Sequence, residues 1–138
     1  MVVVRTDRER GQTVSVMVLG FVAALIMVAG LVVDGGQKAA AMNRAETLAA
    51  GAARAAANAG AGGTLGSATD QTLAAERART AAKGYLAAAG GGISSTVRVN
   101  GDEVVVRTQI RVHTIFLSLI RINTLRATGA ATAKVVPN

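Results

Sequence analysis

Few side chains in this chain could carry out catalytic chemistry. It has no cysteine and a single histidine, His113, and no serine or carboxylate accompanies that histidine in a recognisable catalytic pattern. The lack of cysteine excludes disulfides and thiolate metal sites, and no phosphate-binding loop, zinc-ligand spacing or paired-carboxylate signature occurs. The sequence therefore predicts a protein that is not an enzyme and binds no cofactor or metal, with His113 as a surface residue of a strand.

Basic residues are the other candidates for chemistry, because the formal net charge is +7, from 15 basic and 8 acidic side chains. After residue 96, arginines alternate with valine and isoleucine, the spacing that places them on one face of β-strands. These arginines are Arg98, Arg107, Arg111 and Arg126. Such a stripe could bind DNA or an anionic cell-wall polymer, although no aromatic residues are interleaved with it to stack on bases. A solvated basic surface is the simpler interpretation.

An uncharged segment near the N-terminus sets the architecture that positions these residues. No charged side chain occurs from Gly11 to Val33, and Asp34 ends the run. About 20 apolar residues let an α-helix cross the roughly 30 Å of hydrocarbon in a membrane. We therefore predict a transmembrane helix at residues 12–34 in contact with membrane lipid. Asp34 should lie at the membrane boundary, where interfacial solvation is its simplest role.

A cleavable secretory signal is the alternative interpretation of this segment. The preceding basic stretch suits a signal, but the apolar run exceeds the usual length of about 7–15 residues and its small residues lie inside the run. Arginines at positions 5, 8 and 10 outnumber the acidic residues beside them, and basic residues are retained on the cytoplasmic side. The prediction is a single-pass protein of the cytoplasmic membrane, with a cytoplasmic leader at residues 1–11 and an extracytoplasmic C-terminal domain.

An alanine-rich helix is predicted to extend the anchor over residues 35–58, because alanine is the best helix former and no proline interrupts it. Gly35 and Gly36 predict a bend or local melting where the helix leaves the membrane. Glu46 lies inside the alanine tract. A stripe of small side chains on this helix would let another backbone approach closely. Its members are Ala41, Ala45, Leu48, Ala49, Ala52 and Ala56.

A second helix is predicted after a glycine-rich connection at residues 59–67. Thr69 is its expected N-cap, Asp70 lies in its first turn, and three glycines from Gly90 end it. One face of this helix is expected to be apolar. That face comprises Ala74, Ala78, Ala81, Tyr85, Leu86 and Ala89.

The remaining chain predicts a small antiparallel sheet, so that residues 59–138 form an exported α+β head. Asn100-Gly101 indicates a tight hairpin turn, which would set Arg98 opposite Glu103 and Val97 opposite Val104. A further strand is expected at 125–136, with small residues on its inner face. Between the strands, the apolar run 115–120 is too short to span a bilayer. It should be a core-packed loop or short helix, with a partner-binding or membrane-touching patch as the alternative.

The N-terminal part resembles a known family. The residues that carry this resemblance are Arg8–Gln12, the helix end Leu31–Asp34, and the alanine tract Met42–Ala53 with Glu46 inside it. They closely resemble the N-terminal module of the TadE/TadG-like proteins of Flp (tight-adherence) pilus assembly. The stretch Leu125–Ala133, which follows a hairpin, is similar to the end of small members of that group.

This resemblance implies a pilin-like or pseudopilin-like fold and a structural role in pilus assembly or adhesion. The partners implied are other pilin-like subunits, the inner-membrane pilus-assembly platform and a prepilin peptidase that cuts between Gly11 and Gln12. Val16 stands where typical substrates carry glutamate. A filament subunit in an extracellular pilus and a membrane-resident assembly factor both remain open.

Small residues in the anchor suggest how such a subunit would associate with its neighbours. Helices in lipid pack through close contact between small side chains, and the same surface could pack against sister helices in a filament. The candidate positions are Gly20, Ala23, Ala24 and Gly30.

Overall fold

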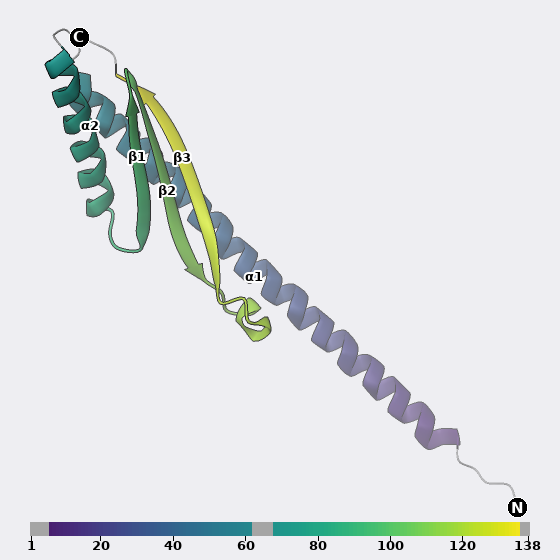
Figure 1. The fold of residues 1–138 in the computed structure, drawn as a ribbon. Coiled ribbons are helices and arrows are strands. Elements are labelled where there is room, and N and C mark those ends of the chain that lie inside the picture. Colours follow the sequence, from purple (N-terminus) through teal and green to yellow (C-terminus); the bar gives the residue numbers. More distant parts are fainter. Residues whose placement is uncertain (1–5, 62–67, 136–138) are drawn as a thin grey trace, which may run out of the picture.

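The computed structural model describes residues 6–61 and 68–135, so most of the predicted glycine-rich connection lies outside the described residues. The elements follow the chain in the order α1 (Thr6–Gly60), α2 (Ala68–Ala88), β1 (Ile93–Asn100), β2 (Glu103–His113), the 3-10 helix η2 (Leu117–Ile120) and β3 (Thr124–Lys134). Figure 1 shows α1 as a long rod that projects well beyond a small head. The predicted α+β class, with two helices and a small antiparallel sheet, is confirmed.

Helix α1 runs without a break through the position of the predicted bend. It has 55 residues, which corresponds to about 80 Å at 1.5 Å per residue. Gly35 and Gly36 lie within it, so the helix does not melt there, and Figure 1 shows no sharp bend. Each glycine costs about 1 kcal/mol relative to alanine, but α1 contacts Phe116 at Gly30 before this pair and β3 at Ala45 after it. These contacts hold the helix straight. The predicted leader and alanine-rich extension both contribute to this one helix.

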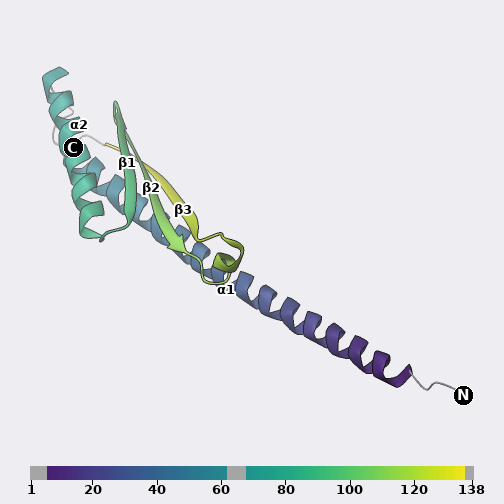
Figure 2. The same cartoon turned by 60° about the horizontal axis from the view of Figure 1, so that its bottom comes forward.

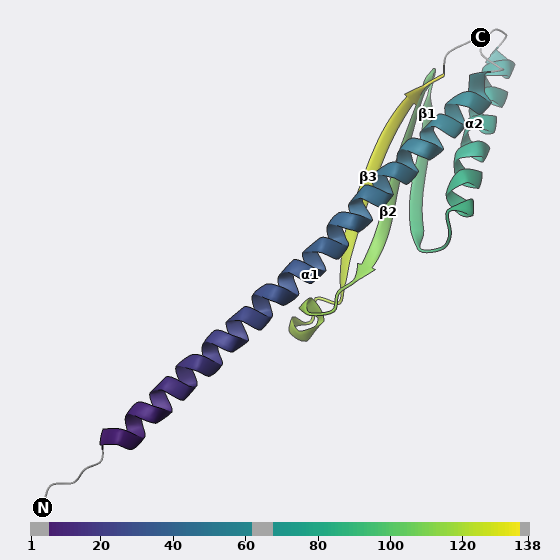
Figure 3. The ribbon, with the colours of Figure 1, turned by 180° about the vertical axis from the view of Figure 1, so that it is seen from behind.

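The sheet has the strand order β1-β2-β3, and both pairings are antiparallel. Helix α1 contacts β2 and β3, while α2 contacts β1 and α1. The turned view in Figure 2 and the view from behind in Figure 3 place both helices on the same face of the sheet. The opposite face, called here the outer face, is covered by no helix or strand of the described chain.

The β1-β2 hairpin has a different register from the predicted one. Asn100 pairs with Glu103 and Arg98 pairs with Val105, so Arg98 does not face Glu103 and Val97 does not face Val104. The central turn residues are Gly101 and Asp102, and Gly101 has a φ of 61°, the position at which type II′ turns favour glycine. Because the turn centre moves by one residue, each strand partner moves by two and every side chain keeps its face.

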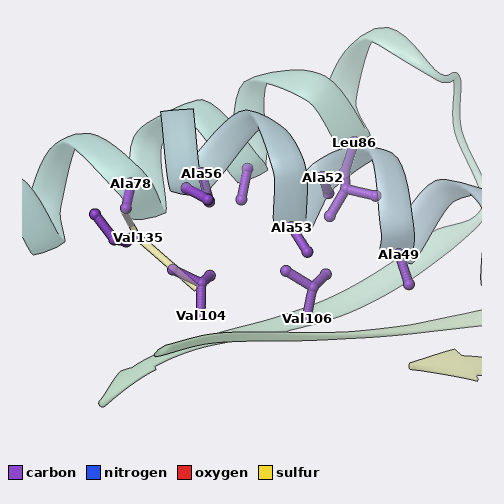
Figure 4. Packing of buried hydrophobic residues seen from close by; sticks show 11 residues of the cluster. Ala49, Ala52, Ala53, Ala56, Ala78, Leu86, Val104, Val106 and Val135 are labelled. Carbon is purple, nitrogen blue, oxygen red and sulfur yellow. The ribbon is translucent and has the colours of Figure 1, made fainter. Parts of the chain in front are cut away.

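The core between helices and sheet is built from small side chains (Figure 4). Of the predicted α1 stripe, Ala45, Ala49, Ala52 and Ala56 are buried, whereas Ala41 and Leu48 are partly buried; Ala53 and Ala57 are buried in addition. On α2, Ala82 is buried in the line of Ala74, Ala78 and Leu86, whereas the predicted Tyr85 is 43% exposed. Helix α2 begins at Ala68, so Thr69 lies inside its first turn instead of capping it. The buried core cluster consists of Ala49, Ala52, Ala53, Ala56, Ala57, Ala78, Ala82, Leu86, Val104, Val106 and Val135.

Strand β3 approaches α1 closely enough that only glycine fits at one position. A Cβ on Gly129 would lie 2.6 Å from the carbonyl oxygen of Ala45 and would also overlap the amide nitrogen of Glu46. Beside it, the buried hydroxyl of Thr108 donates a hydrogen bond to that same Ala45 carbonyl at 2.7 Å. The expectation that the third strand seats the helix on an inner face of small residues is confirmed.

Candidate functional site around Asp34

Asp34 joins α1 to the loop between β2 and β3. Its side chain is 1% exposed. One carboxylate oxygen accepts the N–H of Ile115 at 2.9 Å, and the other accepts the N–H groups of Phe116 at 3.0 Å and Leu117 at 2.7 Å. These amides lie at the start of η2, where helical N–H groups have no partner within the helix. Asp34 therefore caps η2 from another element, and the expectation that its carboxylate is solvated was wrong.

Gly30 lies one helical turn before Asp34 and receives the ring of Phe116. Residues four apart share a helix face, so Gly30 and Asp34 both point at the same loop. A Cβ on Gly30 would lie 2.6 Å from the Cβ of Phe116, at the base of that side chain, where rotation gives little relief. We call this set, with Ile115 and Leu117, the Asp34 clamp. It combines charge-assisted hydrogen bonds with steric fit.

The loop held by the Asp34 clamp is closed by its own hydrogen bonds. The Thr114 hydroxyl donates to the carbonyl of Ile122, and the Thr114 N–H donates to the carbonyl of Asn123 at 3.1 Å. Arg121 has a φ of 66°, and its N–H donates to the Ser118 carbonyl at 3.0 Å. The short helix expected in this segment is therefore present, and its backbone is tied down at both ends.

Four large apolar side chains of this closed loop point away from the protein. We call them the apolar knob, and they are Ile115, Leu119, Ile120 and Ile122. Leu119 is 82% exposed and Ile120 is 64% exposed. Only Phe116 and Leu117 of the predicted apolar run are partly buried. The expectation that this segment packs into the core therefore holds in part for Phe116 and Leu117 and is wrong for the exposed side chains of the apolar knob.

The N-terminal part of α1 is apolar and exposed on all sides. Its most apolar 18-residue window has a mean hydropathy of 2.9, and 6% of that window is buried. Within the described chain, this is one helix long and apolar enough to span a membrane. Gly20, Ala23 and Ala24 are exposed on it. Gly30 is covered by Phe116, so it is not available to pack against another helix as predicted.

Gly11 and Gln12, the candidate cleavage residues, both lie inside α1, which begins at Thr6. Glu46 is exposed farther along the same helix. In the described ranges no group of three or more histidine, cysteine, aspartate or glutamate side chains could hold a metal ion. His113 is exposed at the end of β2.

The predicted anion-binding arginines share the outer face of the sheet. Arg111 pairs with Arg126 across β2 and β3, Arg107 pairs with Ala130, and Arg98 pairs with Val105. All four arginines are exposed. Within the described residues the salt-bridge pair is Arg79 with Glu76, so none of the four is neutralised by a carboxylate there. The sequence thus placed these arginines on one face correctly.

Sequence reasoning missed the contact between Asp34 and the loop 81 positions later. One signal could have suggested it. The N-cap of η2 is Phe116, which has no side-chain oxygen and makes no capping hydrogen bond. Because the first amides of a helix need acceptors, a segment without a local cap predicts an acceptor from elsewhere, and Asp34 is an unpaired carboxylate beside an apolar run.

Comparison with known proteins adds no assignment, because no family model, no curated protein and no solved structure matches the chain.

Proposed function

We propose that this chain is a membrane-anchored, pilin-like component of a Tad/Flp-type pilus that acts structurally in pilus assembly or adhesion. The observation that carries the proposal is the division of α1 into two parts. Up to Val33 its apolar side chains are exposed, whereas from Ala45 onward one face is buried under α2 and the sheet. A single helix that is both anchor and core suits the pilin-like fold that the resemblance of the N-terminal part to TadE/TadG-like proteins implies.

The exposed part of α1 requires apolar surroundings. Burial of apolar surface is worth about 25 cal/mol per Å², so a helix with exposed side chains such as Leu19, Phe21 and Met27 is unstable in water. Lipid supplies such surroundings in the membrane, and sister helices would supply them in a filament. Gly20, Ala23 and Ala24 remain free to form close helix contacts in either setting.

The contacts that Gly30 and Asp34 make with the head favour a retained anchor over a cleaved signal. Cleavage directly after Gly30 would remove the residue on which Phe116 rests and would make Asp34 the fourth residue of the shortened chain. The clamp would then lose its steric contact, and its carboxylate would lie in the first turn of a shortened helix. Retention of the helix therefore fits the contacts of the head, and cleavage before Gln12 would leave every one of those contacts intact.

Mass spectrometry of the protein from membranes and from sheared surface fibres tests this proposal. A filament subunit should appear in fibres with Gln12 as its first residue, and a Gly11→Leu variant should stay uncut in the membrane. A Gly20→Leu variant, changed at an exposed glycine of the same helix, is the control and should still be processed. Recovery only as uncut chain in membranes would favour an assembly factor. Recovery in the soluble fraction would contradict the proposal.

Binding of an anionic polymer is a second candidate, favoured by the four exposed arginines on the outer face. DNA binding should weaken steeply between low and moderate salt, because counterions are released when arginine contacts phosphate. An Arg107→Gln, Arg111→Gln double variant should lower both the affinity and the salt dependence, whereas Arg54→Gln on α1 should leave both unchanged. Binding that does not fall with salt would contradict this candidate.

A further inference from the structure

We propose that the apolar knob inserts into the extracytoplasmic leaflet of the cytoplasmic membrane, beside α1. This insertion gives the head a second attachment to lipid. This inference rests on the proposed anchoring of the chain through α1. Its partner is therefore a lipid surface, and the contact is continuous with the one that the exposed part of α1 makes.

The Asp34 clamp fixes the knob at the right height. The exposed apolar surface of α1 ends at Val33, directly before Asp34. Gly30, on which Phe116 rests, lies about 5 Å deeper than Val33 at 1.5 Å per residue. Figures 1 and 3 show η2 at the end of the sheet that faces the projecting half of α1. The knob thus lies where a membrane crossed by α1 would meet the head.

The backbone of the loop is prepared for an apolar environment. Irregular backbone is tolerated at membrane depth only where its polar groups have partners. Asp34 accepts the amides of Ile115, Phe116 and Leu117, and the Ile122 amide donates to the Leu117 carbonyl at 3.0 Å. The turn therefore presents aliphatic side chains outward while its first amides are already bonded inward.

The charges around the knob suit a membrane surface. No acidic residue follows Glu103 in the sequence, and the carboxylate of Asp34 is covered by the three amides. The charged side chains at this end of the head include Arg121 in the loop, the Arg111–Arg126 pair in the adjoining strands, and Lys38 on α1. Each basic residue near an anionic leaflet contributes about 1 kcal/mol of attraction, and long arginine side chains reach headgroups from an apolar base.

The chain has no tryptophan, so the fluorescence of a single introduced tryptophan reports the depth of that residue in the bilayer without a signal from other tryptophans. We would place full-length Leu119→Trp in vesicles of phosphatidylethanolamine and phosphatidylglycerol that contain brominated lipids. Thr132→Trp, on the exposed outer face of β3, is the matched control for the head. Phe21→Trp, in the middle of the apolar run, is the reference for the anchor.

The knob should behave as a shallow membrane residue. Leu119→Trp should emit at shorter wavelength than Thr132→Trp, and bromine near the glycerol end of the lipid chains should quench it most. Phe21→Trp should be quenched most by bromine near the chain ends. Adding Asp34→Ala to Leu119→Trp should reduce the quenching, because the clamp then no longer holds the knob at that height.

The outcomes separate this inference from the proposed anchoring. If Phe21→Trp is quenched and Leu119→Trp is not, the anchor stands and membrane insertion of the knob is refuted. A blue-shifted Leu119→Trp that lipid bromine does not quench indicates a protein partner or a second copy, which also refutes it. If Phe21→Trp is not quenched, the proposed anchoring itself fails.

Discussion

Replacing Gly129 by alanine tests how closely the sheet approaches α1. A Cβ at this position would lie 2.6 Å from the Ala45 carbonyl oxygen, whereas ordinary contacts lie near 3.5 Å. Strand and helix would therefore have to separate by about 1 Å. The atoms of α1 that this Cβ would meet belong to the backbone of Ala45 and Glu46, so no side-chain rotation can relieve the overlap. That separation would also stretch the 2.7 Å hydrogen bond from Thr108 to Ala45 beyond bonding distance.

The expected loss combines two effects. Overpacking a well-filled interior costs about 1–3 kcal/mol, and loss of the hydrogen bond costs about 1 kcal/mol more. We therefore expect Gly129→Ala to lower the free energy of unfolding by about 2–4 kcal/mol. For a head of about 100 residues this is a fall in Tm of roughly 10–20 °C. Thermal unfolding of the full chain in detergent, followed by circular dichroism, measures this shift.

Gly84→Ala is the matched control for this prediction. Gly84 lies exposed within α2, and a Cβ there would meet nothing within 4 Å. Alanine should stabilise the helix by about 1 kcal/mol because it loses less conformational entropy than glycine. The two substitutions add the same methyl group and should shift the Tm in opposite directions. A Gly129→Ala protein that unfolds within about 0.5 kcal/mol of the unchanged chain would refute the close approach of strand and helix.

Three further substitutions test the Asp34 clamp and its neighbourhood. Asp34→Ala should speed hydrogen exchange at the amides of residues 115–117, which lose their acceptor, whereas Asp102→Ala should leave them protected; equal exchange in both variants would contradict the clamp. Gly30→Ala should be less stable than Gly35→Ala by about 1–3 kcal/mol in denaturant unfolding, because only the first methyl meets Phe116; equal stability would show that the ring does not rest there. Thr108→Val should lower the free energy of unfolding by about 1 kcal/mol in the same assay. An unchanged free energy of unfolding would show that the hydrogen bond from Thr108 to Ala45 does not stabilise the fold.

Much of the fold was predictable because the spacing of apolar residues along the sequence indicates both the type of secondary structure and the face that is buried. The alanine stripe on residues 41–56 predicted which face of α1 is buried, and the alternation in 125–136 predicted which residues of β3 face inward. Turn chemistry was less reliable. Asn100 and Gly101 both suit the centre of a tight turn, but the turn also accommodates Gly101-Asp102. Valines remain on the inner face in either register, so the hydrophobic pattern alone could not choose between them.

The central feature of the candidate site could not be read from spacing. Asp34 and Phe116 are separated by most of the chain, and their contact depends on how the sheet docks on α1. A carboxylate after an apolar run has a satisfactory local explanation as a solvated boundary residue. The same is true of Gly30, which looks like one of several small residues in a membrane helix. Their roles become visible only when tertiary structure brings the β2-β3 loop against both residues.

Labelling of single cysteines in intact cells tests the proposed membrane topology, because the chain has no cysteine of its own. In the proposed topology the N-terminus lies in the cytoplasm and the head outside, with the apolar part of α1 in the membrane between them. A membrane-impermeant maleimide should then label Thr132→Cys in intact cells and Val3→Cys only after permeabilisation. Labelling of Thr132→Cys only after permeabilisation, or recovery of the protein in the soluble fraction, would contradict the proposed anchoring and orientation.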